Sequence, residues 1–232
     1  MPNDDVTTWL FWDIDGTLLT TGRAGIFAWE AAAAEAAGRP MDLQTLQTAG
    51  LTDFAIGRAI LESLGLASDA GRLARFVRMY EEALPSVLPR RQGRVLEGVR
   101  DILEHVRAER PDIGLYLLTG NTPGGARAKL TYYGLFGFFQ GGAFADGNGD
   151  RAHIARRALV LATSGRPVAL ERVFVIGDTP HDVICGLAIG AKTIAVASGN
   201  YPIEALQAEA PWRALRSLPD VETFLALLEE PA

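Results

Sequence analysis

Hydrophobic and polar residues divide the chain into stretches of different period. Residues 9–12 are an apolar run that is too short for a helix and ends at Asp13, a pattern typical of a buried strand. Beyond a polar connection the apolar residues recur every three or four positions. This spacing predicts helices over 26–37, 51–64 and 69–84, the last one closed by Pro85.

After residue 98 the pattern changes to short apolar runs that alternate with helical periodicity. We expect strands at 113–118, 138–139, 173–176 and 193–197. Helices are expected from residue 99 to near 111 and over 123–133, 151–162, 180–189 and 221–228. Strands that are apolar throughout and alternate with helices indicate a parallel sheet covered on both faces. The predicted fold class is therefore α/β, with a Rossmann-like parallel sheet.

The helical block follows the first strand directly, and a segment rich in proline and glycine, 85–98, leads out of it. At 232 residues the chain is long enough for one domain with a large insertion or for two domains. We expect an α/β core domain of residues 1–20 and 92–232 and a helical domain of residues 21–91. The helical domain would lie above the strand ends as a lid.

Composition narrows the possible partners. The net charge is −6, and no basic stripe of the kind that binds nucleic acid or a membrane surface is present. No run approaches the roughly 18 apolar residues of a membrane span, and the acidic first five residues do not resemble a secretory signal. The one cysteine, Cys185, has no partner in the chain for a disulfide. We expect a cytoplasmic protein, and the pattern favours no particular oligomeric state.

Candidate chemistry gathers where the predicted strands end. Asp13 and Asp15 follow the first strand, Thr119 follows the strand at 113–118, and Asp178 follows the strand at 173–176. Ligands of parallel sheets bind beyond the carboxyl ends of the strands. Because side chains alternate along a strand, Asp13 and Asp15 can share one face while Ile14 points into the core.

Convergent carboxylates at this edge suggest a hard divalent cation, and Mg²⁺ fits best because it takes oxygen ligands that it often shares with a phosphate. Its ligands would be Asp13, the backbone carbonyl of Asp15, and Asp178. Asp13 would attack phosphorus to form an aspartyl-phosphate, while Asp15 would protonate the leaving oxygen and later deprotonate water. Thr119 would bind a phosphoryl oxygen. The backbone amides near Gly124, at a predicted helix N-terminus, also suit an anion.

Three motifs in this order resemble motifs one, two and four of the haloacid dehalogenase superfamily: Asp13-Ile14-Asp15-Gly16-Thr17-Leu18, Thr119, and Gly177-Asp178-Thr179-Pro180-His181-Asp182. The resemblance covers nearly the whole chain. It implies that the helical insertion is a C1 cap, as in phosphoglycolate phosphatase-like members, and that Asp182 supports the metal. It also implies a phosphotransferase acting on a small phosphorylated metabolite, since dehalogenases lack the second aspartate.

Motif three of that superfamily is a basic residue, and here two candidates stay open. Arg151 opens a predicted helix upstream of Asp178, and Lys129 lies in the helix after Thr119. Substrate-binding candidates are Gly120 and Asn121 beside motif two, Lys129, and the pair Thr52 and Asp53. Asn121 could instead only shape its turn, and Thr52 and Asp53 could be no more than a helix cap.

Two other readings remain. The same fold could carry a phosphomutase or a phosphonatase, although a phosphonatase is expected to offer a lysine from the cap, and residues 21–91 contain none. A protein of another class, a receiver that only accepts a phosphoryl group, also collects acids, a threonine and a lysine at parallel strand ends. Receivers are about half as long and lack an insertion after the first acidic strand, so we favour the phosphatase.

Overall fold

The computed structural model describes residues 6–147 and 151–231, and its centre is a six-stranded sheet. All paired neighbours in this sheet run parallel, in the order β5-β4-β1-β6-β7-β8. This confirms the predicted fold class. The strands are β1 (Thr8–Trp12), β4 (Ile113–Leu118), β5 (Gly141–Ala143), β6 (Val173–Gly177), β7 (Lys192–Val196) and β8 (Arg213–Leu215).

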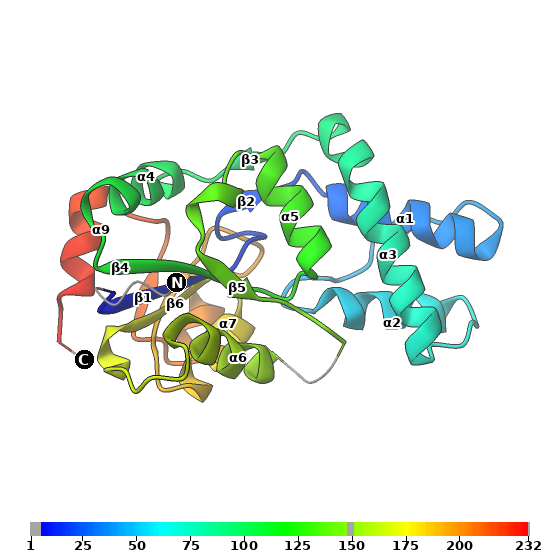
Figure 1. The fold of residues 1–232 in the computed structure, drawn as a ribbon. Coiled ribbons are helices and arrows are strands. Elements are labelled where there is room, and N and C mark those ends of the chain that lie inside the picture. Colours follow the sequence, from blue (N-terminus) through cyan, green and yellow to red (C-terminus); the bar gives the residue numbers. More distant parts are fainter. Residues whose placement is uncertain (1–5, 148–150, 232) are drawn as a thin grey trace.

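Helices cover both faces of the sheet (Figure 1). Leu10 and Trp12 of β1 pack on one face with residues of α4 (Val99–Glu109), α5 (Pro123–Tyr132) and α9 (Val221–Leu228). Trp9 and Phe11 pack on the other face with residues of α6 (Arg151–Thr163) and α7 (Pro180–Ala188). A further helix, α8 (Ile203–Gln207), packs against β7 and β8. Side chains alternate along a strand, so an apolar β1 buries both of its faces.

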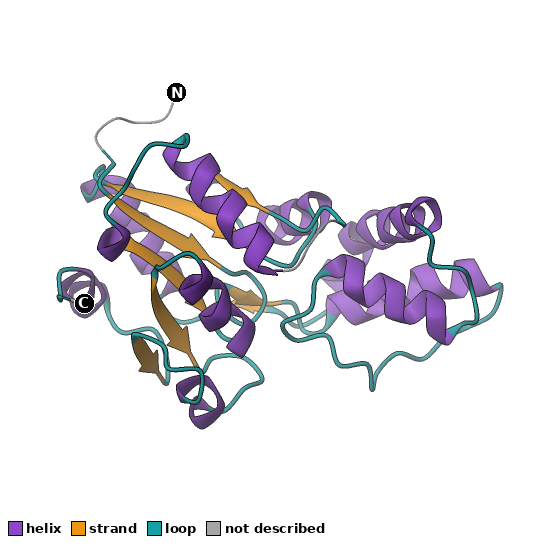
Figure 2. Ribbon diagram, turned by 90° about the horizontal axis from the view of Figure 1, so that it is seen from below, coloured by secondary structure: helices purple, strands orange, loops and turns teal. Residues whose placement is uncertain are grey.

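Three helices form a separate group beside the sheet: α1 (Ala24–Ala37), α2 (Asp53–Ser63) and α3 (Ala70–Val87). They bury a hydrophobic cluster of their own around Trp29, whose ring stacks on Tyr80 with 4.1 Å between ring centroids. In Figure 2 the arrowheads of the sheet point toward this group. The helical group therefore lies at the carboxyl ends of the strands.

The chain enters and leaves the helical group at one place. There β2 (Leu19–Thr20) pairs antiparallel with β3 (Arg94–Val95). The side chain of Arg91 donates from Nε to the Gly22 carbonyl at 3.0 Å, which ties the exit to the entry. The helical group also contacts the core through α3, which packs against α5. The predicted domain boundaries at residues 20 and 92 fall close to this junction, and the division into two domains remains a prediction.

Two local predictions were wrong. Pro85 does not end its helix, since α3 continues to Val87; the proline removes one intrahelical N–H donor, and only two helical residues follow it. The aromatic strand expected at 138–139 does not form there, because Phe138 ends a short 3₁₀ helix, η2 (Phe136–Phe138). The strand that pairs with β4 is instead β5, a few residues later. Pairing with β4 selects Gly142 instead, since a Cβ atom there would lie 2.6 Å from the Leu117 Cβ.

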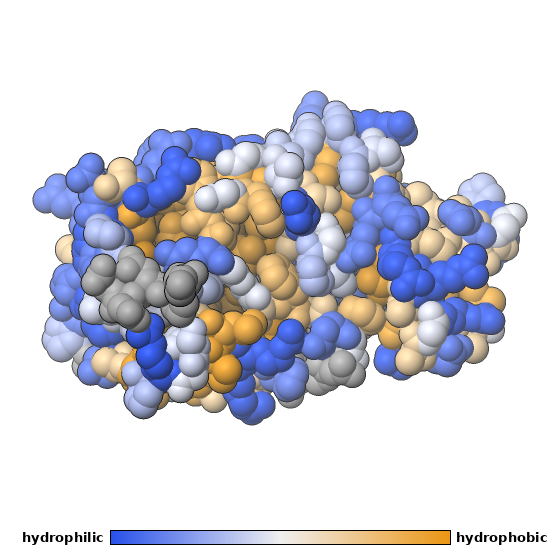
Figure 3. All heavy atoms as spheres, viewed as in Figure 1, coloured by the Kyte–Doolittle hydropathy of each residue, from blue (hydrophilic) through white to orange (hydrophobic). Residues whose placement is uncertain are grey.

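Hydrophobic side chains gather in the middle of the face in Figure 3, over β4 and α5, and hydrophilic side chains cover much of its rim. Within residues 6–147 and 151–231, no helix has both the length and the apolar character needed to cross a bilayer. The acidic residues 1–5, on which the comparison with a secretory signal rests, lie outside the described residues.

Candidate active site

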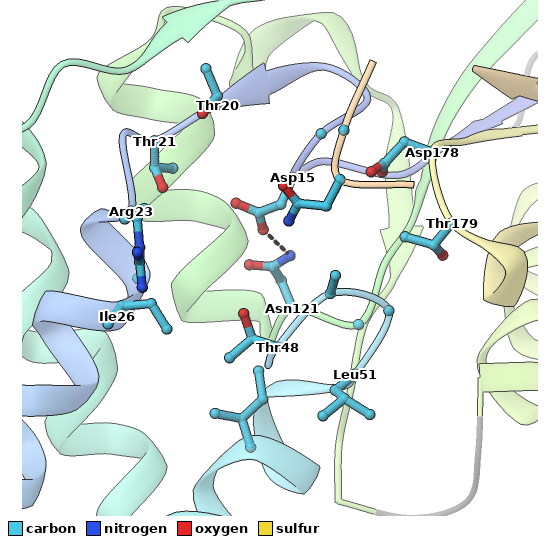
Figure 4. A pocket seen from close by; sticks show the side chains of 18 of the residues that line it. Asp15, Thr20, Thr21, Arg23, Ile26, Thr48, Leu51, Asn121, Asp178 and Thr179 are labelled. Atoms are coloured by element: carbon cyan, nitrogen blue, oxygen red, sulfur yellow. Dashed lines mark hydrogen bonds between the residues drawn. The ribbon is translucent and has the colours of Figure 1, made fainter. Parts of the chain in front are cut away.

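The carboxyl ends of β1, β4 and β6 are neighbours in the sheet, so Asp13, Thr119 and Asp178 come together as the sequence predicts. Asp13 and Asp178 line a cavity of about 630 Å³ between the sheet and the helical group. Its opposite wall comes from α1, α2 and the segment 44–51 (Figure 4). Polar strand ends thus form the floor of the cavity, and the inserted helices form its roof.

Three buried aspartates could hold a metal ion. Asp13, Asp178 and Asp182 each offer one carboxylate oxygen, and these oxygens lie within 4.8 Å of one another. The Oγ1 hydroxyl of Thr17 donates to Asp178 Oδ1 at 3.1 Å and orients that carboxylate. Gly16, at φ +87°, passes so close that a Cβ atom there would lie 2.3 Å from Asp178 Oδ2. Hard oxygen donors at this spacing fit Mg²⁺.

The electrostatics of this cluster also fit a cation. Burial, together with the nearby charge of Asp182, raises the pKa of Asp13 to about 7, although Arg151 opposes the shift. Burial and the charges of Asp182 and Asp13 raise the pKa of Asp178 as well. Like charges out of water disfavour ionisation, and a divalent cation removes that cost.

Arg151, the first residue of α6, lies within this carboxylate cluster. Its Nη2 is 3.7 Å from Asp13 Oδ1 and forms an ion pair with Asp182 Oδ1. The other oxygen of Asp182 accepts hydrogen bonds from the backbone N–H of Thr179 at 3.0 Å and from its hydroxyl at 2.6 Å. Asp182 therefore fixes the start of α7 and positions Arg151 beside the expected nucleophile. This is the place at which motif three would act.

Asp15 is held from the opposite side of the sheet. Its Oδ2 accepts from Asn121 Nδ2 at 2.9 Å (Figure 4). The same oxygen accepts from Lys129 Nζ at 2.5 Å. Both partners belong to the β4–α5 segment, whereas Asp13 meets a residue of α6. Both aspartates line the cavity, and the Asp13 N–H still donates to the Ile176 carbonyl at 3.0 Å just beyond the end of β1. Ile14 is fully buried in the core, as expected.

Asp53 joins the helical group to the core. Its backbone N–H donates to the Gly120 carbonyl at 2.8 Å, and its Oδ2 accepts from the backbone N–H of Thr122 at 2.7 Å. Thr122 is the N-cap of α5, and its hydroxyl accepts from Gly125 N. The anion at this helix N-terminus is therefore the chain's own carboxylate, and the Gly125 amide is used by the cap. Burial raises the pKa of Asp53 to about 6.

The remaining candidates occupy different places. Gly120 and Asn121 line the cavity, as do Lys129 and Asp53. Thr52 lies outside it and caps α2, because its hydroxyl accepts from Ala55 N at 3.2 Å. Thr119 is fully buried behind the cavity floor, and its Oγ1 accepts hydrogen bonds from the backbone and side chain of Asn121.

Sequence reasoning missed the segment after β7. Ser198, Gly199 and Asn200 line the cavity, and Ser198 Oγ donates to the Gly16 carbonyl at 2.7 Å. A Cβ atom at position 199 would lie 1.7 Å from Asp178 Oδ2, so only glycine fits there. The strand-end rule that found Asp13 could have found this segment too.

Comparisons with known proteins bear on the family of this chain. The family model described as haloacid dehalogenase-like hydrolase matches residues 10–186, and a second model of the same kind matches residues 151–222. A sequence relative is the "Probable phosphatase IndB" of Dickeya dadantii (strain 3937). It is 26% identical over 205 residues, which cover 87% of this chain and 86% of the relative.

Solved structures share the fold. A predicted phosphatase from Clostridium acetobutylicum superimposes with a TM-score of 0.73 at 18% identity, covering 97% of this chain and 100% of the other. A predicted phosphoglycolate phosphatase from Haemophilus somnus gives a TM-score of 0.71 at 15% identity, covering 97% and 99%. The parallel sheet, the aspartates at its strand ends and a family match over residues 10–186 together lead to one assignment. The chain belongs to the haloacid dehalogenase-like hydrolase family.

Proposed function

We propose that this hydrolase is a Mg²⁺-dependent phosphatase that cleaves a small phosphomonoester through an aspartyl-phosphate intermediate. The observation that carries the proposal is the buried cluster of Asp13, Asp178 and Asp182 with Arg151 beside Asp13. A nucleophilic carboxylate, hard oxygen donors and a guanidinium meet at one end of a polar cavity. The phosphatase relative of similar length points to the same reaction.

In this proposal a carboxylate oxygen of Asp13 attacks phosphorus, and the bond from phosphorus to the ester oxygen breaks. Asp15 gives its proton to the departing oxygen and becomes a carboxylate. It then takes a proton from water as the water oxygen attacks phosphorus and the bond to Asp13 breaks. The products are an alcohol and inorganic phosphate, and both aspartates return to their starting state.

The residues that would hold Mg²⁺ are Asp13, the backbone carbonyl of Asp15, Asp178 and, through water, Asp182. When bound, the ion would offset the negative charge of the phosphate and its nucleophile. Arg151 takes the motif-three role in this proposal, because it pairs with Asp13 and Asp182. Its guanidinium offers donors in a fork that matches phosphate oxygens. Lys129 instead contacts Asp15.

The helices of residues 21–91 act here as a C1 cap that selects the substrate. On that side the polar side chains of Thr20, Thr21, Arg23, Gln44, Gln47 and Thr48 line the cavity beside apolar ones such as Ile26, Trp29, Leu46 and Ile56, so polar contacts are available away from the carboxylates. A small hydroxylated or acidic ester, phosphoglycolate among them, suits such a lining.

The unpaired, buried Cys185 fits a reducing location such as the cytoplasm.

The test is phosphate release from a panel of phosphorylated metabolites by purified protein. We expect turnover with Mg²⁺ and none with a chelator, and Asp13→Asn should lower kcat by at least about 10³-fold because an amide is a poor nucleophile. When turnover of an ester with a radioactive phosphoryl group is quenched with acid, the label should stay bound to the wild-type chain but not to the Asp13→Asn variant. Undiminished turnover by Asp13→Asn would refute the mechanism. Transfer to a second hydroxyl without free phosphate would indicate a mutase.

A further inference from the structure

Lys129, Asn121 and Asp15 form a closed triangle of hydrogen bonds. Lys129 Nζ donates to Asp15 Oδ2 at 2.5 Å and to Asn121 Oδ1 at 2.6 Å. Asn121 Nδ2 donates to the same Asp15 oxygen at 2.9 Å. Each side of the triangle is therefore a direct contact, and the position of one member fixes the other two.

The triangle rests on a rigid part of the core. Asn121 immediately precedes the N-cap of α5, and Lys129 lies in the second turn of that helix. Helical side chains lean toward the helix N-terminus, so the lysine stem runs back along α5 toward Asn121. Its side chain is only 5% exposed, whereas that of Asp15 is 42% exposed. A buried ammonium thus reaches a carboxylate that is open to the cavity.

The contacts single out one oxygen of Asp15. Both donors meet Oδ2, and Figure 4 shows the other oxygen of Asp15 turned away from Asn121, into the cavity. The ammonium of Lys129 and the amide of Asn121 therefore hold Oδ2 in place from two directions.

We propose that Lys129, together with Asn121, is a positioning residue for Asp15, which keeps Oδ1 aimed at the leaving oxygen and then at the attacking water. The inference rests on the proposed phosphatase reaction. Lys129 does not act on the phosphoryl group in this role. It balances the charge that Asp15 gains when its proton moves to the departing oxygen, and it holds that carboxylate while a proton returns from water.

This role predicts a signature that depends on the leaving group. A 4-nitrophenolate leaves without a proton, whereas the alkoxide of benzyl phosphate needs one from Asp15. In Lys129→Met we expect kcat/KM to fall about 10- to 100-fold for benzyl phosphate and less than about 3-fold for 4-nitrophenyl phosphate. Water attack is shared by both esters, so kcat should fall for both. Rapid mixing with 4-nitrophenyl phosphate should then show a burst of nitrophenolate before slow turnover.

Three variants serve as comparisons. Lys192 is the only other lysine of the sequence, is also buried, and donates to the Glu230 carbonyl away from the cavity. Lys192→Met should therefore leave kcat/KM at its wild-type value for benzyl phosphate and for 4-nitrophenyl phosphate. Arg151→Met should slow both esters to a similar extent, since Arg151 lies beside Asp13. Asn121→Ala removes the second donor and should reproduce the leaving-group dependence, which keeps the test available if Lys129→Met does not fold.

The outcomes separate the two proposals. If the wild-type protein hydrolyses neither ester and no metabolite with Mg²⁺, the proposed function fails. If the wild type is active but Lys129→Met and Asn121→Ala lose the same factor in kcat/KM on both esters and show no burst, the positioning role is wrong and the phosphatase stands. A larger loss for benzyl phosphate together with the burst supports the positioning role.

Discussion

Asp53 shows how a single side chain is defined by its surroundings rather than by its position in the sequence. The sequence offers it as a helix cap or a substrate contact, and in the structure it is a buried carboxylate that accepts from Thr122 at the start of α5. Burial raises its pKa from 3.8 to about 6, in spite of nearby Lys129. The folded chain therefore binds this proton more tightly than the unfolded chain does.

This shift predicts a pH dependence of stability. Between about pH 4 and pH 6 the native state holds the Asp53 proton and the unfolded state releases it, so the contribution of this group to stability falls as pH rises. Asp53→Asn should gain on the order of 2–3 kcal/mol relative to wild type between pH 4 and pH 7, because the amide has no charge to bury. Denaturant unfolding at each pH, with a chelator present to remove divalent cations, measures this difference in the free energy of unfolding. The exposed Asp69→Asn is the control, and a constant difference for Asp53→Asn across this range would contradict the prediction.

At the scale of residues, the sequence located the candidate site but not the partners within it. Asp13, Asp15 and Asp178 follow apolar strands, which is a local signal, and the fold brings them to one cavity. Lys129 carries no such signal. It lies within a helix, 114 residues from the carboxylate that it meets, and only the packing of α5 on β1 and β4 brings them together. The choice between Arg151 and Lys129 likewise depends on contacts between distant segments.

Among the elements, those with a strong period were predicted and the shortest ones were not. Helices α4 and α9 begin where expected, and β4 covers the predicted 113–118. The two-residue strands β2 and β3 have no period of their own and exist because they pair with each other. β5 was placed wrongly, because close approach to β4 outweighed the local preference of aromatic residues for strands.

Packing within the helical group makes a prediction of its own. Gly57 lies on the buried side of α2, where a Cβ atom would be 3.1 Å from Trp29, 3.2 Å from Leu73 and 3.3 Å from Val77. Gly57→Val should therefore destabilise the fold by about 1–3 kcal/mol through overpacking, although valine favours a helix more than glycine does. Gly71→Val on the exposed side of α3 is the matched control and should change stability by less than about 0.5 kcal/mol. Thermal unfolding compares them, and equal midpoints would show that the three helices are loosely packed.

For the whole molecule, the carboxylate cluster links folding to metal binding. Mg²⁺ that binds only the folded chain stabilises it, by about 2.7 kcal/mol at one hundred times its dissociation constant. Because the pKa of Asp13 is about 7, protons compete with the ion, and the rise in Tm on adding Mg²⁺ should be larger at pH 8 than at pH 6. Asp178→Asn should remove most of the rise. A rise that is equal at both pH values, or retained in Asp178→Asn, would place the metal elsewhere.

The sequence by itself determined the fold class, the order of its main elements and the strand ends that carry Asp13, Thr119 and Asp178. It could do so because hydrophobic period and strand-end polarity are local properties of the chain. Only the tertiary structure decided that Arg151 meets Asp13 and that Lys129 and Asn121 hold Asp15. It also decided that Asp53 occupies the N-terminus of α5. These pairings depend on how helices pack on opposite faces of one sheet, and that packing is a property of the whole chain.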